Sequence, residues 1–207
     1  MEHQRAKIYA ANLYEELKQD TNNLTKTIER IKTVAGRLDT FCLLSAEKGT
    51  RKASNGMLYY YSSHSTWINF FSSSNTTIEE LKGSGNLRIM KNNVSKKISE
   101  YSRELKEMES EYQLTRPEFA KIEELYFRIF DGYVSQPYRE RGDISRDSVF
   151  GLNPLLINDD LKLMKEFTGW LKFEASVYLE QNKNFMLPIK ETATALISLL
   201  EKEYHLK

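Results

Sequence analysis

The chain has 207 residues, with 30 Lys or Arg against 29 Asp or Glu, a balance that argues against a nucleic-acid-binding or anionic-membrane surface. Its one cysteine, Cys42, excludes an internal disulfide and argues against a cysteine-ligated metal site. Only 4 prolines and 9 glycines interrupt the chain, and no strand-like alternation competes with helical periodicity, so the predicted fold class is all-α.

Residues 3–46 are predicted to form one helix. Two rows, mostly apolar, repeat every seven positions and share one face: Leu17, Leu24, Ile31 and Leu38 in the first, and Tyr14, Thr21, Ile28, Ala35 and Cys42 in the second. Because Cys42 lies in this stripe, we expect it to be a small core residue and not a nucleophile.

The segment 54–91 is predicted to hold short helices. Ser54 and Asn55 are expected to cap a helix over 57–61, which the serine-rich run 62–65 would interrupt. A second short helix should begin with a capping box at Thr76 or Thr77 and end at Gly83.

Residues 93–130 carry the most regular pattern of the chain. Two heptad rows keep their phase across Pro117: Ile98, Leu105, Tyr112, Phe119 and Tyr126 in one, and Val94, Tyr101, Met108, Thr115, Ile122 and Ile129 in the other. A break followed by a new helix would not preserve that register, so one long helix, kinked near Pro117, is predicted.

Residues 131–158 are rich in glycine, proline and charge and are predicted to form a loop. A third long helix is expected over 159–205, capped by Asn158 and with acidic residues in its first turn. Its rows, which begin at Leu171 and Ala175, continue in phase past Pro188. The pattern favours a single kinked helix, with a hairpin that turns at 182–184 as the alternative.

These elements predict an elongated antiparallel bundle of three long kinked helices plus short helices, in a single domain over 1–207. The chain itself does not contain a clear fourth long helix to cover the apolar stripes. A homodimer would close the bundle, or the segment 50–91 would do so within one chain.

Few residues suggest catalysis. The three histidines, His3, His64 and His205, are scattered, and none follows a glutamate at the spacing of a helical di-metal site. No Gly-x-Ser-x-Gly nucleophile elbow is present either. We therefore expect a protein without enzymatic activity, metal or cofactor. Convergent carboxylates or histidines in a closed cleft would instead indicate an enzyme.

The run Lys82-Gly83-Ser84-Gly85-Asn86 is similar to a phosphate-binding loop, but its spacing fits neither common glycine pattern and no strand precedes it. A structural corner explains each residue. Gly83 would take the left-handed conformation at the helix end, Gly85 would let the chain reverse, and Asn86 would cap the next turn.

Aromatic residues suggest one place for a ligand. Tyr59, Tyr60 and Tyr61 precede a second aromatic group, and we expect most of these rings to pack between the long helices. A candidate inter-helix ligand pocket would be formed by Trp67, Phe70, Phe71 and Trp170.

The segment 74–89, SNTTIEELKGSGNLRI, resembles the hallmark T-y-E-E-L-k-s-S-G-N-L-r-l-I of an uncharacterised bacterial family of membrane-anchored helical proteins. Residues 2–7 and 13–20 look like the juxtamembrane start of its soluble part, and residues 199–203 resemble its helical end. The departures are Gly83, where the family often has serine, and the two prolines within the long helices.

The resemblance implies a membrane span upstream of this chain, in the cell membrane, with the bundle facing the periplasm or the outside. It implies no activity and no catalytic residues. The expected function is a non-enzymatic interaction, scaffold or sensory module with an unidentified protein partner. The alternative is a small-molecule-binding sensor that uses the inter-helix aromatic pocket.

Overall fold

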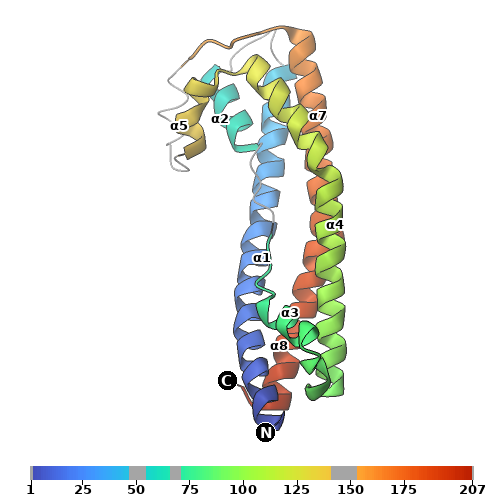
Figure 1. The fold of residues 1–207 in the computed structure, drawn as a ribbon. Coiled ribbons are helices and arrows are strands. Elements are labelled where there is room, and N and C mark those ends of the chain that lie inside the picture. Colours follow the sequence, from blue (N-terminus) through green and yellow to red (C-terminus); the bar gives the residue numbers. More distant parts are fainter. Residues whose placement is uncertain (1, 47–54, 66–70, 141–152, 207) are drawn as a thin grey trace. The chain divides into compact units, whose positions relative to one another are not determined.

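The computed structural model describes residues 2–46, 55–65, 71–140 and 153–206, without the side chains of 63–65, 115–117 and 137–140. Its elements are α1 (Glu2–Ala46), α2 (Asn55–Ser65), α3 (Thr76–Gly83), the 3₁₀ turn η1 (Asn86–Ile89), α4 (Asn92–Ile129), α5 (Gly132–Glu140), α7 (Leu161–Gln181), the π-helical turn η2 (Asn182–Met186) and α8 (Leu187–Tyr204). Figure 1 labels the main helices.

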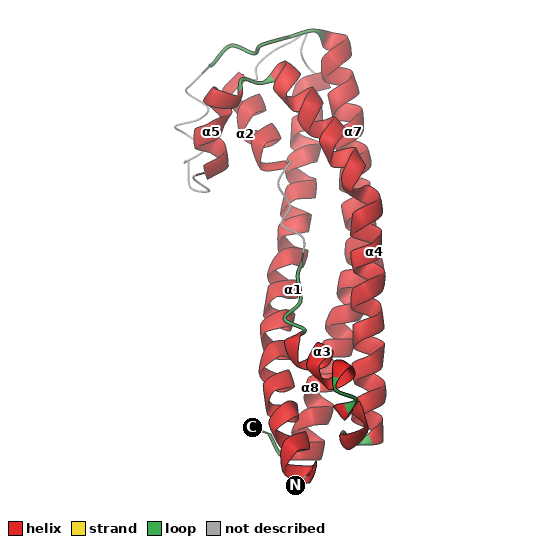
Figure 2. Ribbon diagram, viewed as in Figure 1, coloured by secondary structure: helices red, strands yellow, loops and turns green. Residues whose placement is uncertain are grey.

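The all-α prediction is confirmed, because the described part of the chain is helical and contains no strand (Figure 2). The three predicted long helices are present within two residues of their expected ends. α4 runs without a break through Pro117, and α7, η2 and α8 form one continuous helix through Pro188. The hairpin alternative at 182–184 is therefore wrong.

The chain comprises two compact units. The first contains Met1–Glu29, Phe70–Gln113 and Gln181–Lys207, and the second contains Arg30–Asn69 and Leu114–Glu180. Each long helix contributes residues to both units. The single domain predicted over 1–207 stays a prediction.

In the first unit, the early part of α1 lies antiparallel to α8 and parallel to α4. The Tyr14 hydroxyl donates a hydrogen bond to Glu201 (2.9 Å), and Thr192 donates one to Glu104 (3.2 Å). Apolar residues of the predicted stripes, such as Leu17 and Ile98, are fully buried there. Burial of these stripes is the main stabilising contribution in a helical bundle of this kind.

In the second unit, five buried aromatic rings form the core: Phe41, Tyr59, Tyr126, Phe130 and Phe167. Their centroids lie 4.9 to 6.2 Å apart, mostly in tilted or edge-to-face pairs, which are the favoured geometries. The Tyr59 hydroxyl donates to the carbonyl of Leu155 and accepts from the amide of Asp131. The prediction that Tyr59 and Tyr61 pack within the bundle is confirmed.

The π-helical turn η2 shifts the buried face of the third long helix by one residue. Before the turn, Leu171 and Tyr178 are buried, as predicted. After it, the row continues at Met186, Ala193 and Leu200, whereas the predicted members Phe185 and Leu199 are only half-buried. Pro188 lacks the N–H that would bond four residues back, and a π turn nearby accommodates an extra residue. The first predicted row therefore loses its phase at Phe185 and Leu199, whereas Ile189 and Leu196 of the second predicted row are buried as expected.

Two predicted interruptions are helical instead. α2 continues through the serine-rich run to Ser65, where the Ser62 hydroxyl donates to the carbonyl of Tyr59 (3.2 Å). Residues 132–140, predicted as part of a loop, form α5. Asp131 caps this helix, since its carboxylate accepts from the amides of Tyr133 and Val134. Residues 153–158 contain no helix, as predicted for the loop, and residues 141–152 lie outside the described residues.

Two predicted helix caps are also different. α7 begins at Leu161, and the carboxylate of Asp160, not Asn158, accepts the amide of Leu163 (2.8 Å). α3 has no capping box of its own. Glu16 of α1 replaces it, because its carboxylate accepts both the amide and the hydroxyl of Thr77. An acidic group at a helix N-terminus also interacts favourably with the helix dipole.

Candidate functional site

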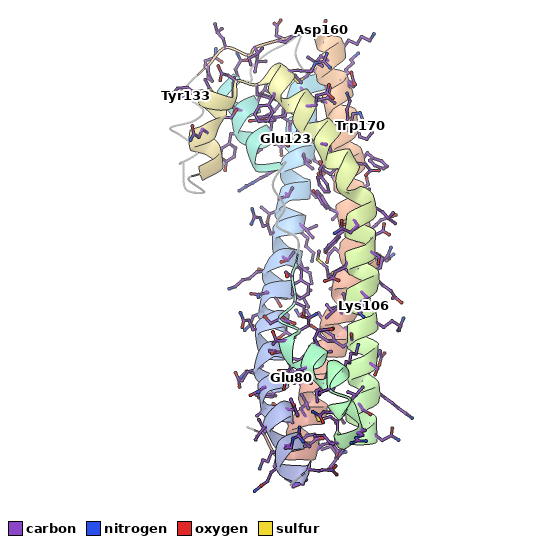
Figure 3. The ribbon with its side chains drawn as sticks, viewed as in Figure 1. Glu80, Lys106, Glu123, Tyr133, Asp160 and Trp170 are labelled. Atoms are coloured by element: carbon purple, nitrogen blue, oxygen red, sulfur yellow. The ribbon has the colours of Figure 1, made fainter. Side chains whose placement is uncertain are left out.

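A groove of about 400 Å³ lies in the second unit between α4 and α7. It is lined by Glu118 from α4 and by Lys165, Glu166, Gly169, Trp170 and Phe173 from α7. Figure 3 shows Trp170 on α7, beside α4. The volume falls in the lower part of the range of small-molecule sites.

Two aromatic side chains form the apolar part of the groove. Trp170 is half-buried, Phe173 is 48% exposed, and their ring centroids lie 6.2 Å apart in an edge-to-face arrangement. The core of this unit lies on the other face of α7, where Phe167 and Leu171 are fully buried. α7 therefore has apolar side chains on two faces, one that packs in the core and one that is partly exposed. A partly exposed apolar face is typical of a binding site.

Gly169 is an exposed lining residue of the groove. A Cβ atom built at this position would meet no atom within 4 Å, and the residue lies in the interior of α7. Glycine in a helix interior costs about 1 kcal/mol relative to alanine. Since nothing in the protein requires the missing side chain, the open space above Gly169 is available to a molecule from outside.

A buried carboxyl group lies near the groove. Glu174 is only 5% exposed; one carboxylate oxygen accepts the Tyr178 hydroxyl (2.7 Å), and the other has no hydrogen-bond partner. Burial raises the pKa of Glu174 to about 7; the Tyr178 hydrogen bond opposes this rise, and the negative charge of Glu118 adds to it. The Tyr178 ring packs against Phe119 of α4, at 5.7 Å between centroids.

Two buried amides mark the π-helical turn of the first unit. Gln181 and Asn182 are each 4% exposed, and neither polar atom of the Gln181 amide nor Oδ1 of Asn182 has a hydrogen-bond partner. π turns often occur at functional positions. We attach no ligand to these amides.

The segment Gly83–Asn86 is a corner between α3 and η1. Gly83 ends α3, but the left-handed residue is Gly85, with φ of 68°, and not Gly83 as predicted. The amides of Ser84 and Gly85 bond to the carbonyls of Glu80 and Lys82, so they are occupied within the turn. Asn86 makes no cap; its side-chain amide donates to the Tyr9 hydroxyl of α1 (3.3 Å).

Replacing Gly85 by valine should lower the free energy of unfolding by about 2 kcal/mol, because a β-branched side chain clashes in the left-handed conformation. Gly83→Ala is the matched control, since Gly83 has no positive φ and space for a Cβ. It should leave stability unchanged or slightly raised. Urea unfolding followed by circular dichroism measures both; equal effects of the two substitutions would contradict the assignment of the corner.

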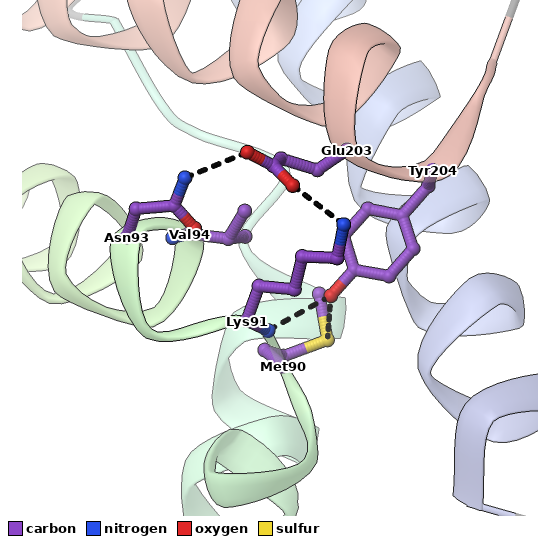
Figure 4. A network of polar contacts seen from close by, with 6 residues as sticks. All are labelled: Met90, Lys91, Asn93, Val94, Glu203 and Tyr204. Atoms are coloured by element: carbon purple, nitrogen blue, oxygen red, sulfur yellow. Dashed lines mark hydrogen bonds and ion pairs between the residues drawn. The ribbon is translucent and has the colours of Figure 1, made fainter.

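A polar network joins the end of α8 to the start of α4 in the first unit (Figure 4). The Glu203 carboxylate accepts from the Lys91 ammonium (2.6 Å) and the Asn93 amide (2.9 Å). The Tyr204 hydroxyl accepts the backbone amide of Lys91 (3.0 Å) and contacts the sulfur of Met90. These polar groups bind one another, so we interpret the network as a structural link between the two helices and not as a ligand site.

The four residues of the predicted aromatic pocket have separate outcomes. Trp67 and Phe70 lie outside the described residues. Phe71 is 5% exposed and belongs to the first unit, whereas Trp170 belongs to the second and lines the groove. The pocket as predicted stays a prediction, but Trp170 does lie at a ligand-sized groove.

The sequence prediction missed the other five lining residues, which are Glu118, Lys165, Glu166, Gly169 and Phe173. A signal was present in α7, because Trp170, Phe173 and Val177 recur at helical spacing beside the core row and supply a second apolar stripe. A glycine in the interior of a strongly periodic helix was the other signal.

Among the described residues, no group of three or more His, Cys, Asp or Glu side chains is arranged to hold a metal ion. Cys42 is buried on the apolar face of α1, and burial raises the pKa of its thiol. A raised thiol pKa disfavours the reactive thiolate. None of the described helices combines the length and the apolar composition that a bilayer crossing requires.

No protein-family model matches the chain, and no curated protein or solved structure matches it either. The resemblance of residues 74–89 to the membrane-anchored helical family therefore stays a prediction.

Proposed function

We propose that this chain is a non-enzymatic binding module, the interaction or sensory part of a larger membrane-anchored protein, and that its binding site is the groove between α4 and α7. The observation that carries the proposal is the groove itself, in which two partly exposed aromatic rings flank an open glycine. Ligand sites combine apolar walls with a few polar groups, and this groove has both.

The membrane anchor and the location facing the periplasm or the outside rest only on the resemblance to the membrane-anchored helical family. The proposal allows for binding to another protein and for a homodimer of this chain. Light scattering distinguishes a dimer from a monomer of 24.2 kDa.

The proposal is tested with tryptophan fluorescence. The chain has two tryptophans, so the Trp67→Phe variant leaves Trp170 as the only indole reporter. Titration with a panel of anionic, neutral and cationic small molecules should give a saturable change in Trp170 emission for at least one class. A panel that produces no saturable response would contradict the groove as a binding site.

A second variant separates specific binding from quenching. Trp170→Ala in the otherwise unchanged chain should abolish the thermal stabilisation that the same compound gives the parent protein, because a ligand that binds only the folded state raises the melting temperature. Stabilisation that persists without Trp170 would place the compound elsewhere.

A further inference from the structure

The charged residues of the groove carry a second conclusion, which rests on the proposed function. Glu118 and Glu166 contribute two carboxylates and Lys165 one ammonium, so the lining has an excess of one negative charge. Within the part of the chain that the structure describes, neither carboxylate makes a hydrogen bond or an ion pair. Both charges are therefore available to a ligand.

The aromatic residues favour the same sign of ligand charge. The faces of indole and phenyl rings are negative, and tryptophan is the strongest partner for a cation. Trp170 and Phe173 thus add to the attraction that the two carboxylates exert. An anion would meet two carboxylates and one ammonium, and an uncharged apolar ligand would desolvate the carboxylates without replacing their water.

The size and openness of the site restrict the ligand further. The volume of about 400 Å³ fits a small molecule, and the missing side chain at Gly169 lets a bulky group come close to the helix. Ammonium ions that carry several alkyl groups are weakly hydrated and bulky, and aromatic sites recognise them for that reason.

The geometry points to a small alkylammonium cation as the ligand of this groove, held between the carboxylates of Glu118 and Glu166 and against the rings of Trp170 and Phe173.

Titration calorimetry with choline and with its uncharged carbon isostere, 3,3-dimethyl-1-butanol, tests this directly. Choline should bind at least about tenfold more tightly, since the two compounds differ in charge and hardly in shape. Glu118→Gln and Glu166→Gln should each weaken choline binding by roughly threefold to tenfold.

The matched control is Glu180→Gln. It removes an exposed carboxylate of α7, the helix that carries Glu166, and this carboxylate does not line the groove. It should leave the affinity for choline unchanged. Lys165→Met should strengthen choline binding, because it removes the one positive charge of the lining.

Four outcomes would overturn the inference. The isostere could bind as tightly as choline, or an anion such as benzoate could bind better; the groove would then be a binding site for another class of ligand, and the proposed function would stand. A tri-lysine peptide could bind with sensitivity to Glu118→Gln while choline does not, which would make the occupant a basic protein segment. If no probe of any charge changes Trp170 emission, the proposed function fails together with the inference.

Discussion

Replacing Asp20 by alanine should lower the free energy of unfolding by about 4 kcal/mol, the largest effect expected for a single substitution in this chain. Asp20 is 1% exposed, and its carboxylate accepts three hydrogen bonds from segments distant in sequence: the hydroxyls of Ser73 (2.6 Å) and Tyr101 (2.8 Å) and the amide of Ser74 (2.9 Å). Alanine would leave these three donors without their acceptor, and each buried unsatisfied donor costs about 1–3 kcal/mol.

The Tyr101 hydroxyl is the most buried of the three donors, in a side chain that is 0% exposed. Burial and the adjacent Asp20 carboxylate raise the pKa of Tyr101 far above its usual value, so it donates at every working pH. Tyr101→Phe removes one of the three bonds and should cost about 1–2 kcal/mol. Urea unfolding of Asp20→Ala and Tyr101→Phe measures both losses of stability, and the loss should be larger for Asp20→Ala.

Asp39→Ala is the control for Asp20, since Asp39 is an exposed aspartate on the same helix. Its effect should stay within about 0.5 kcal/mol, as for most surface substitutions. If the two aspartate variants were equally stable, the carboxylate of Asp20 would not be what holds residues 73 and 74 against α1 and α4.

The second large effect is a pH dependence caused by Glu174. Burial raises the pKa of its carboxyl to about 7 in the folded protein, from an ordinary value of 4.5. Below pH 4.5 the carboxyl group is protonated in both the folded and the unfolded state, so it does not lower the free energy of unfolding. Between pH 4.5 and 7 the unfolded chain loses the proton first, so stability falls as pH rises, and above pH 7 the loss levels off at about 3 kcal/mol.

The measurement compares the parent protein with Glu174→Gln over pH 4 to 8.5. The variant has no titrating group at this position, so its advantage over the parent should grow by about 3 kcal/mol across the range. Glu180→Gln, an exposed carboxylate on the same helix, should follow the parent at every pH. A difference between parent and Glu174→Gln that does not change with pH would mean that Glu174 is solvated in the folded state.

The long helices could be predicted from the sequence because their stability comes from faces that repeat every seven residues. Val94, Tyr101 and Met108 are buried as that repeat requires. The repeat also predicted correctly that Pro117 and Pro188 do not end their helices. It could not predict the π turn at 182–186, because the extra residue is a local response to Pro188 and the packing around it, and it moves Leu200 into the core in place of Leu199.

The caps and the corner depended on residues distant in the chain. Glu16 caps a helix that begins sixty residues later, and Asn86 bonds to Tyr9 instead of to its own turn. Local capping patterns contain no information about such partners. α5 was missed for a different reason. Gly132 was interpreted as a loop residue, although Asp131 immediately before it caps the helix.

The groove was only partly predictable. Trp170 was selected because it is aromatic, and it does line the groove, while the pocket predicted around it stays a prediction. Phe173 and Glu118 enter the site because two helices meet there, and that meeting is a property of the fold. Gly169 was the one lining residue whose place in the helix was itself unusual.

The central claim, that the groove binds a ligand, is tested most directly by comparing Gly169→Ala with Gly36→Ala. Both glycines lie in helix interiors with open space for a Cβ, so each substitution should raise the free energy of unfolding by about 0.5–1 kcal/mol. Affinity is then measured for the compound that gives the largest Trp170 response. The account predicts that Gly169→Ala is stabilised but loses at least about tenfold in affinity, while Gly36→Ala is stabilised and binds as the parent does. Equal affinity in the two variants would show that the space above Gly169 is not where the ligand binds.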